Sequence, residues 1–251
     1  MGIEIGLTFF LFAVPAVLIA GISKGGFGSG ASFVAGPIMA LVMPPDVALG
    51  ILLPILMLID AVTLRPYWRQ WDWKEARLLL LGAVPGLALG AAFWSVANPD
   101  ALRLFVGAIS VGYVIWEIAG RARLARAAGP ATPRLGVLAG CLAGFTSFVS
   151  HAGGPVTAVY LLSKGMTKTG YQATTVLFFT MVNIAKAWAY VGFGTISAAT
   201  LQAGLYLAPA AVFGAWIGVV AHRAIPERAF FLVTYVLLFL AGSKLIFDAL
   251  T

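Results

Sequence analysis

Four ionisable side chains lie where the surrounding sequence is apolar or rich in glycine and serine. Asp60 and Lys186 stand deep inside long apolar runs, and Lys24 and His151 stand within Gly/Ser-rich stretches. Ionisable residues are costly inside a membrane and usually mark a transport or binding site there. A lysine can attract an anion, and a histidine can donate hydrogen bonds or carry a proton. These four residues are therefore the first candidates for chemistry.

The stretches next to Lys24 and His151 resemble each other. The first is G-F-G-S-G-A-S-F-V-A-G-P at 26–37, and the second is G-F-T-S-F-V-S-H-A-G-G-P at 144–155. Six of the twelve positions are identical, namely Gly26/Gly144, Phe27/Phe145, Ser29/Ser147, Ser32/Ser150, Gly36/Gly154 and Pro37/Pro155. With small gaps, the register continues and places Asp60 opposite Asn183. Because the matches keep one order along the chain, they predict an internal repeat.

Each Gly/Ser stretch precedes a short apolar segment, and we expect it to form the N-terminal turn of a half-helix. Free N–H groups and the positive end of the helix dipole make such a turn attractive to anions. The serine hydroxyls add further donors. The predicted anion site consists of Lys24, Gly25, Gly26, Ser29, Ser32, Ser147, Ser150, His151, Gly153 and Gly154.

Some of these residues also have an interpretation that involves no ligand. The motif glycines could simply let membrane helices approach closely, which is the role we expect for Gly86, Gly90, Gly214 and Gly218. Lys24 could extend its ammonium group to the membrane interface. His151 could be a buried histidine with satisfied hydrogen bonds.

Asp60, Asn183 and Lys186 form a second group of candidates, for coupling or for a structural intramembrane pair. Unpaired charges at these depths would be expensive. The least costly arrangements are an ion pair of Asp60 with Lys186, or a hydrogen bond between Asp60 and Asn183 across the repeat.

The composition defines the class of protein that holds these residues. Of 251 residues, 61% are hydrophobic and 10% are charged, whereas soluble domains carry about 25% charged residues. The mean hydropathy is +0.98. The net charge of +7 arises mostly from basic residues in four short interruptions between apolar runs. That distribution is typical of cytoplasmic loops and argues against nucleic acid as a partner. We expect no metal and no cofactor.

Ten apolar runs follow one another, at 5–22, 30–43, 47–64, 76–97, 101–119, 135–149, 152–163, 170–192, 199–221 and 227–247. Seven are long enough to cross a bilayer, which takes roughly 20 residues. The runs 30–43, 135–149 and 152–163 would reach only about 21, 22 and 18 Å. We expect these three to be half-helices or re-entrant segments.

The basic segment 121–134 divides the chain into a first repeat, 1–120, and a second, 135–251. If it is cytoplasmic, the basic segments 65–77, 164–168 and 222–228 fall on the same side and both termini lie outside. The two halves then have opposite orientations. The expected fold is an all-α polytopic membrane protein with two inverted repeats, whose short broken helices meet near the midplane. The aromatic residues 67–73 are expected to form an interfacial belt.

Together these motifs resemble the sulfite exporter TauE/SafE family over residues 5–247. The most specific parts are G-I-S-K-G-G-F-G-S-G at 21–30 and S-H-A-G-G-P at 150–155. The resemblance implies a secondary transporter that moves a small sulfur-containing anion, such as sulfite, sulfoacetate or another organosulfonate, across the bacterial inner membrane. It implies that the Gly/Ser motifs line the anion path. Export is the expected direction, and protons are candidate coupling ions, carried by His151, Asp60 or the substrate.

Two other functions and one structural question stay open. A passive anion channel would carry the same sequence features. An intramembrane serine hydrolase would use Ser29 and His151, but Phe27 stands where its Gly-x-Ser-Gly motif requires glycine. We therefore expect no enzyme. The oligomeric state is also open, because Gly-x-x-x-Gly pairs serve a homodimer and internal packing equally well.

Overall fold

The structure is a computed structural model that describes residues 5–27, 32–127, 132–222 and 227–251, with side chains outside 120–127 and 227–231. Of the described residues, 86% are helical. Its elements are α1 (Leu7–Ile22), the π-helical turn η1 (Ser23–Phe27), the 3₁₀ turn η2 (Ser32–Val34), α2 (Ala35–Ala40), α3 (Pro45–Leu64), α4 (Trp73–Val96), α5 (Pro99–Ala127), α6 (Pro133–Ser150), α7 (Gly154–Ser163), α8 (Lys168–Gly192), α9 (Ala198–Ala221) and α10 (Glu227–Leu250). The expected all-helical membrane architecture is confirmed.

Eight helices in the described part of the chain are long and apolar enough to cross a membrane. The expectation of seven was wrong because 135–149 belongs to α6, a helix of 18 residues. This helix begins earlier than the apolar run, at Pro133, where the Thr132 side chain accepts from Leu135 N. The runs 30–43 and 152–163 do contain short helices, since α2 has 6 residues and α7 has 10.

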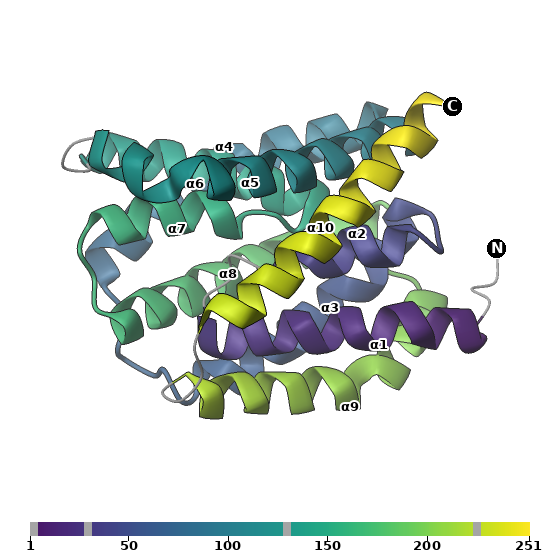
Figure 1. The fold of residues 1–251 in the computed structure, drawn as a ribbon, viewed down its shortest axis with the longest axis horizontal. Helices are drawn as coiled ribbons and strands as arrows, with labels where there is room; N and C mark the ends of the chain where they lie inside the picture. The colour runs from purple at the N-terminus through teal and green to yellow at the C-terminus, as the bar shows by residue number, and fades with distance from the viewer. Residues whose placement is uncertain (1–4, 28–31, 128–131, 223–226) are drawn as a thin grey trace.

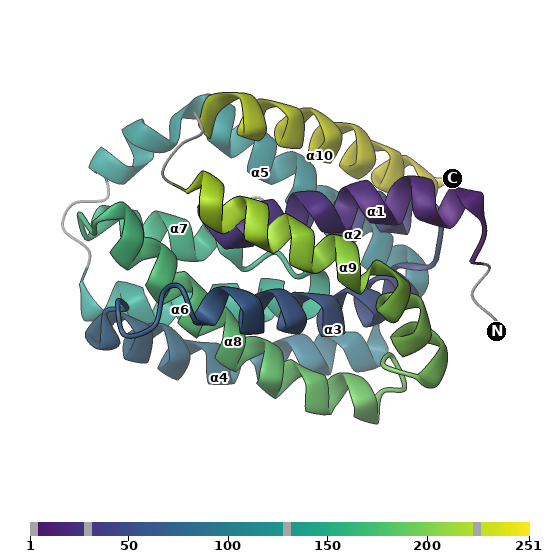
Figure 2. The ribbon, with the colours of Figure 1, turned by 90° about the horizontal axis from the view of Figure 1, so that it is seen from below.

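The helices run along a common direction in three tiers (Figure 1). The upper tier contains α4, α5 and α6, and the lower tier contains α1 and α9. Between them lie α2, α3 and α8, while α10 crosses the front obliquely. Figure 2 shows the same bundle from below, with α1 and α9 side by side. The middle tier is thus enclosed by helices on both sides.

Basic residues from several helix connections meet at one end of the bundle, which we call the basic end. There, Lys168 Nζ donates to His222 O over 2.7 Å, and Lys164 Nζ lies 3.3 Å from Glu75 Oε1. These contacts join the basic connections of three different helix pairs. The start of α1 and the end of α10 lie at the opposite end (Figure 1).

Close helix contacts depend on glycines at two interfaces. A Cβ atom on Gly218 would lie 2.4 Å from Ile22 O, and one on Gly86 would lie 2.1 Å from Cys141 O. Gly214 and Gly90 are similarly close to Leu18 and Phe148. No side chain fits at these distances, so the helix-packing role predicted for these four glycines is confirmed.

The outer faces of the spanning helices are apolar, as contact with lipid requires. Large hydrophobic side chains are widely exposed on seven of them, including Leu11, Leu81, Ile115, Leu138, Trp188, Leu205 and Leu240. In water such continuous apolar exposure would favour aggregation. In a bilayer these side chains meet hydrocarbon, and the polar residues collect inside.

Candidate functional site

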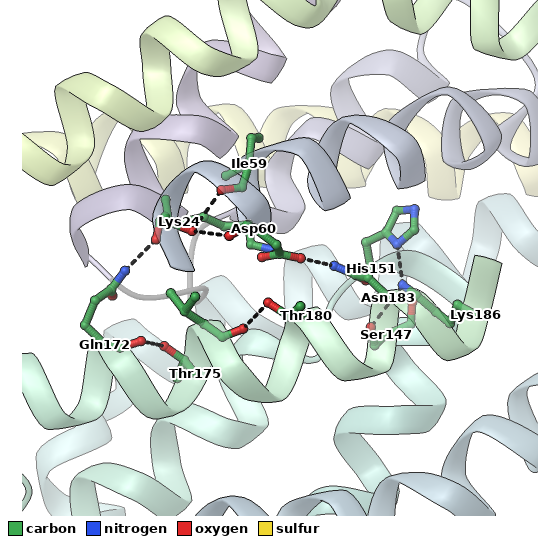
Figure 3. A network of polar contacts seen from close by, with 12 residues as sticks. Lys24, Ile59, Asp60, Ser147, His151, Gln172, Thr175, Thr180, Asn183 and Lys186 are labelled. Carbon is green, nitrogen blue, oxygen red and sulfur yellow. Dashed lines mark hydrogen bonds and ion pairs between the residues drawn. The ribbon is translucent and has the colours of Figure 1, made fainter. Parts of the chain in front are cut away.

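One face of α8 carries polar side chains into the middle of the bundle. Gln172, Thr175, Asn183 and Lys186 lie on this face because their spacing follows the helical repeat. All four are at most 2% exposed. Figure 3 shows Asn183 and Lys186 directed towards Asp60 and His151, which come from other helices. The polar centre is thus assembled from α3, α6, α8 and η1.

Lys24, Asp60 and Asn183 form the first part of this centre. Lys24 Nζ lies 2.5 Å from Asp60 Oδ1, and Asn183 Nδ2 donates to Asp60 Oδ2 over 2.7 Å. All three side chains are buried. The expected hydrogen bond between Asp60 and Asn183 is therefore present. The alternative ion pair with Lys186 was wrong because Lys24 takes that place instead of extending to the interface.

Lys186, Ser147 and His151 form the second part. Lys186 Nζ lies 2.8 Å from Ser147 O, 3.1 Å from Ser147 Oγ and 2.7 Å from His151 Nδ1. His151 Nε2 lies 3.2 Å from Leu49 O. Because a carbonyl oxygen only accepts, Nε2 carries the hydrogen and Nδ1 accepts from Lys186. With Lys186 as an ammonium group, its three hydrogens each have an acceptor and His151 is neutral.

The centre holds more basic than acidic side chains. Asp60 is the single carboxylate that the described residues bring into it, against the ammonium groups of Lys24 and Lys186. Among these residues Lys186 forms no ion pair with a carboxylate. A buried charge that lacks a counter-charge is costly. Such a centre favours an anion close to it.

A small cavity lies between the two parts. It is lined by Lys24, Ser32, Leu56, Ser147, His151, Phe179 and Asn183. The centre of a water molecule can occupy about 10 Å³ of it, which is room for about one water. Five of the seven lining residues are polar, so the cavity offers hydrogen bonds and one ammonium group. A larger anion requires the surrounding helices to move apart.

A π-helical turn brings Lys24 to the cavity. The chain widens from α1 into η1 over Ser23–Phe27, and π-turns are frequent at functional sites. Gly25 and Gly26 face α9, where added Cβ atoms would lie 2.4 Å from Ala215 O and 2.1 Å from Gly218 O. Their missing side chains let η1 rest directly on α9.

The expected N-terminal turns were wrong for the serines of the second motif. Ser147 and Ser150 end α6, and His151 follows with a positive φ of 56° that turns the chain towards α7. The hydroxyl of Ser150 donates to Thr146 O within its own helix. Sequence alone missed this because the motif continues the helix before it breaks.

The glycines of the second motif form the start of α7. Gly153 is the N-cap and Gly154 the first residue of this helix. A Cβ on Gly153 would lie 2.7 Å from Ala143 O and 2.9 Å from the ring of Phe179. Gly153 thus allows α7 to begin close against α6. Ser29, from the first motif, lies outside the described residues.

A second layer of contacts covers the centre towards the basic end. Tyr67 Oη donates to Gly25 O over 2.7 Å, and His222 Nδ1 lies 2.5 Å from Gly26 O. Beyond them lies a wider opening, of about 290 Å³, lined in part by Tyr67, Gln70 and His222. These contacts hold η1 between the opening and the central cavity.

Of the residues predicted for the site, the structure brings together Lys24, Ser32, Asp60, Ser147, His151, Asn183 and Lys186. Sequence reasoning missed Gln172, Tyr67 and His222. Gln172 Nε2 donates to Lys24 O over 2.5 Å, and a glutamine within an apolar run was an available signal. Tyr67 was assigned to an interfacial belt, but it is 4% exposed, whereas Trp68 is 55% exposed. His222 had no local signal.

Comparison with known proteins agrees with this architecture. The family model described as Sulfite exporter TauE/SafE matches residues 13–245, which is nearly the whole chain. No curated protein and no solved structure matches the chain. Because the match covers all of the central residues, this chain belongs to the sulfite exporter TauE/SafE family of membrane transporters.

Proposed function

We propose that this protein is a secondary transporter that binds a small sulfur-containing anion at the Lys24–Lys186 centre. One observation carries the proposal: two buried lysines, Lys24 and Lys186, stand in a centre with one buried carboxylate, and only Lys24 pairs with it. An anion would supply the missing negative charge. A sulfite ion or sulfonate group is compact and has three oxygens, which suits a cavity lined by an ammonium group, an amide, an imidazole and hydroxyls.

Alternating access between the two halves supplies the movement in this proposal. The contacts of the two predicted repeats support it. α1 packs on α9 as α6 packs on α4, and α3 packs on α9 as α8 packs on α4. Each pair maps onto the other when the halves 1–120 and 135–251 are exchanged. Inverted repeats of this kind rock around a site held between them.

The closed cavity favours a carrier over a passive channel. A channel needs a continuous path, whereas the cavity has room for about one water and is covered by the Tyr67 and His222 contacts. In the proposed transport cycle the Tyr67 and His222 contacts break when the site opens to one side of the membrane, while the other side stays closed. An anion flux in a planar bilayer that far exceeds the turnover rate of a carrier would show that the protein is a channel.

A serine hydrolase is disfavoured by the contacts of Ser147. Its hydroxyl is 3.1 Å from Lys186 Nζ, a distance compatible with a nucleophile and its base. However, a lysine acts as a base only after losing its proton. The Ser147 carbonyl, the Ser147 hydroxyl and His151 Nδ1 offer Lys186 three acceptors, a set that matches the three hydrogens of an ammonium group rather than a base.

The proposed location is the bacterial inner membrane, with segment 121–134 in the cytoplasm and both termini outside. The basic residues gathered near one end of the bundle support this orientation. Export remains the proposed direction, because an inside-negative potential drives anions outward.

The direct test of binding is a thermal-shift screen of the purified protein against small anions. A ligand that binds only the folded state raises the melting temperature, by an amount that grows with concentration above Kd. Sulfite or a simple sulfonate should stabilise the protein, while chloride at equal ionic strength should not. Lys186→Gln should lose the shift. Lys244→Gln, which removes an exposed lysine paired with Asp248, should keep it. Equal shifts in both variants would refute the proposed site.

A further inference from the structure

The charge of the centre limits which anions it can accept. Lys24 and Lys186 contribute two positive charges, and Asp60 contributes one negative charge. His151 is neutral, because Leu49 O holds the hydrogen on Nε2 while Nδ1 accepts from Lys186. With both lysines protonated and Asp60 ionised, the net charge of the described centre is +1.

The neighbouring elements do not alter this sum. The undescribed residues 28–31 next to η1 are Gly, Ser, Gly and Ala, which have no ionisable side chains. The sequences of α1 and α2 also have none, and the one such residue in α9, Tyr206, is half exposed. On α5, Tyr113 donates to Glu117 within that helix. Glu75 pairs with Lys164 towards the basic end.

We propose that the centre selects monovalent anions, so that sulfite is carried as hydrogen sulfite and sulfonates with one charge are preferred over dianions. This inference rests on the proposed function. Charges interact strongly where water is excluded, so the loaded centre is most stable when its total charge is zero. One monoanion brings the sum to zero, whereas a dianion leaves an uncompensated negative charge.

The ion pair Lys24–Asp60 determines which anion charge the centre accepts. Lys24 lines the cavity, but its ammonium group is already neutralised by Asp60 at 2.5 Å. The net charge therefore comes from Lys186, which lies behind the cavity wall and donates to two wall residues, Ser147 and His151. Lys186 acts as a positioning residue as well as a charge, because it orients both wall groups. Removing Asp60 would raise the net charge to +2 and should admit dianions.

The test compares sulfite with methanesulfonate in proteoliposomes. Sulfite changes from monoanion to dianion around neutral pH, while methanesulfonate keeps one charge throughout. In the alkaline range the monoanion fraction of sulfite falls about tenfold per pH unit. Initial uptake of sulfite relative to methanesulfonate should fall by the same factor. Because both substrates meet the same protein, the ratio removes any effect of pH on the protein itself.

Sulfate is a dianion of similar shape, and we expect no uptake of it. Asp60→Asn should move maximal sulfite uptake to higher pH and allow sulfate to enter. Asp248→Asn, at an exposed carboxylate, should behave like the unmodified protein. If Asp60→Asn does not fold, the pH dependence of the sulfite-to-methanesulfonate uptake ratio in the unmodified protein still tests monoanion selection. A ratio that stays constant or rises with pH overturns monoanion selection. If neither anion enters, the proposed function fails instead.

Discussion

Lys24 and Asp60 form a buried ion pair with 2.5 Å between Nζ and Oδ1, although 36 positions separate them in the sequence. The π-turn η1 and the C-terminal part of α3 are thereby joined inside the bundle. Removing one partner of a buried pair leaves an uncompensated charge, which costs about 3–5 kcal/mol. We expect Lys24→Met to destabilise the protein by about this amount.

The double variant Lys24→Met with Asp60→Asn should recover part of this loss, because no charge is then left unpaired. The two single variants and the double variant form a cycle, measured by thermal unfolding in detergent. Strictly additive losses would show that the pair is not coupled. The exposed pair Lys244–Asp248 serves as control, since exposed pairs contribute about 0–1 kcal/mol.

The glycine contact between η1 and α9 leads to a second prediction. Gly218→Leu should separate η1 from α9 and destabilise the protein by about 3 kcal/mol, because overpacking forces the backbone apart. Gly112→Ala in α5, where an added Cβ meets nothing within 4 Å, should leave the protein as stable or slightly more stable. Circular dichroism during heating measures both. Equal melting temperatures for the two variants would contradict the packing role.

A thiol reporter can test whether the Tyr67 and His222 contacts with η1 close off the central cavity. Cys141 is the only cysteine, so Ser32→Cys in a Cys141→Ala background places one thiol at the central cavity. We expect a charged thiol reagent to modify it slowly. Tyr67→Phe removes the hydrogen bond to Gly25 O and should raise the rate severalfold. An unchanged rate would show that Tyr67 does not restrain η1.

The orientation of the chain can be measured by labelling in intact cells. In the same Cys141→Ala background, Thr251→Cys should react with a membrane-impermeant thiol reagent from outside. Gln70→Cys, near the basic end, should react only after the cells are opened. Both positions are exposed in the structure. The reverse pattern would place the basic segments outside and invert the proposed topology.

Much of the fold was predictable because membrane helices are governed by length and hydropathy. The contact between Asp60 and Asn183 was also predictable, because the repeat placed the two residues opposite each other. The partner of Lys24 was not, since an ordinary end to α1 would have taken its side chain towards the interface. The π-turn η1 changes its direction, and nothing in the residue pattern announces that turn. Tyr67 and His222 were missed for a related reason: their roles depend on the tertiary position of η1.

Flux through purified protein in liposomes tests the central claim most directly. Proteoliposomes should take up labelled sulfite or methanesulfonate, and uptake should saturate at a rate expected of a carrier. Lys186→Gln should abolish uptake while Lys244→Gln retains it, with equal insertion of both proteins. The absence of uptake of any small sulfur oxyanion by correctly inserted protein, or equal uptake by both variants, would contradict the proposed anion site.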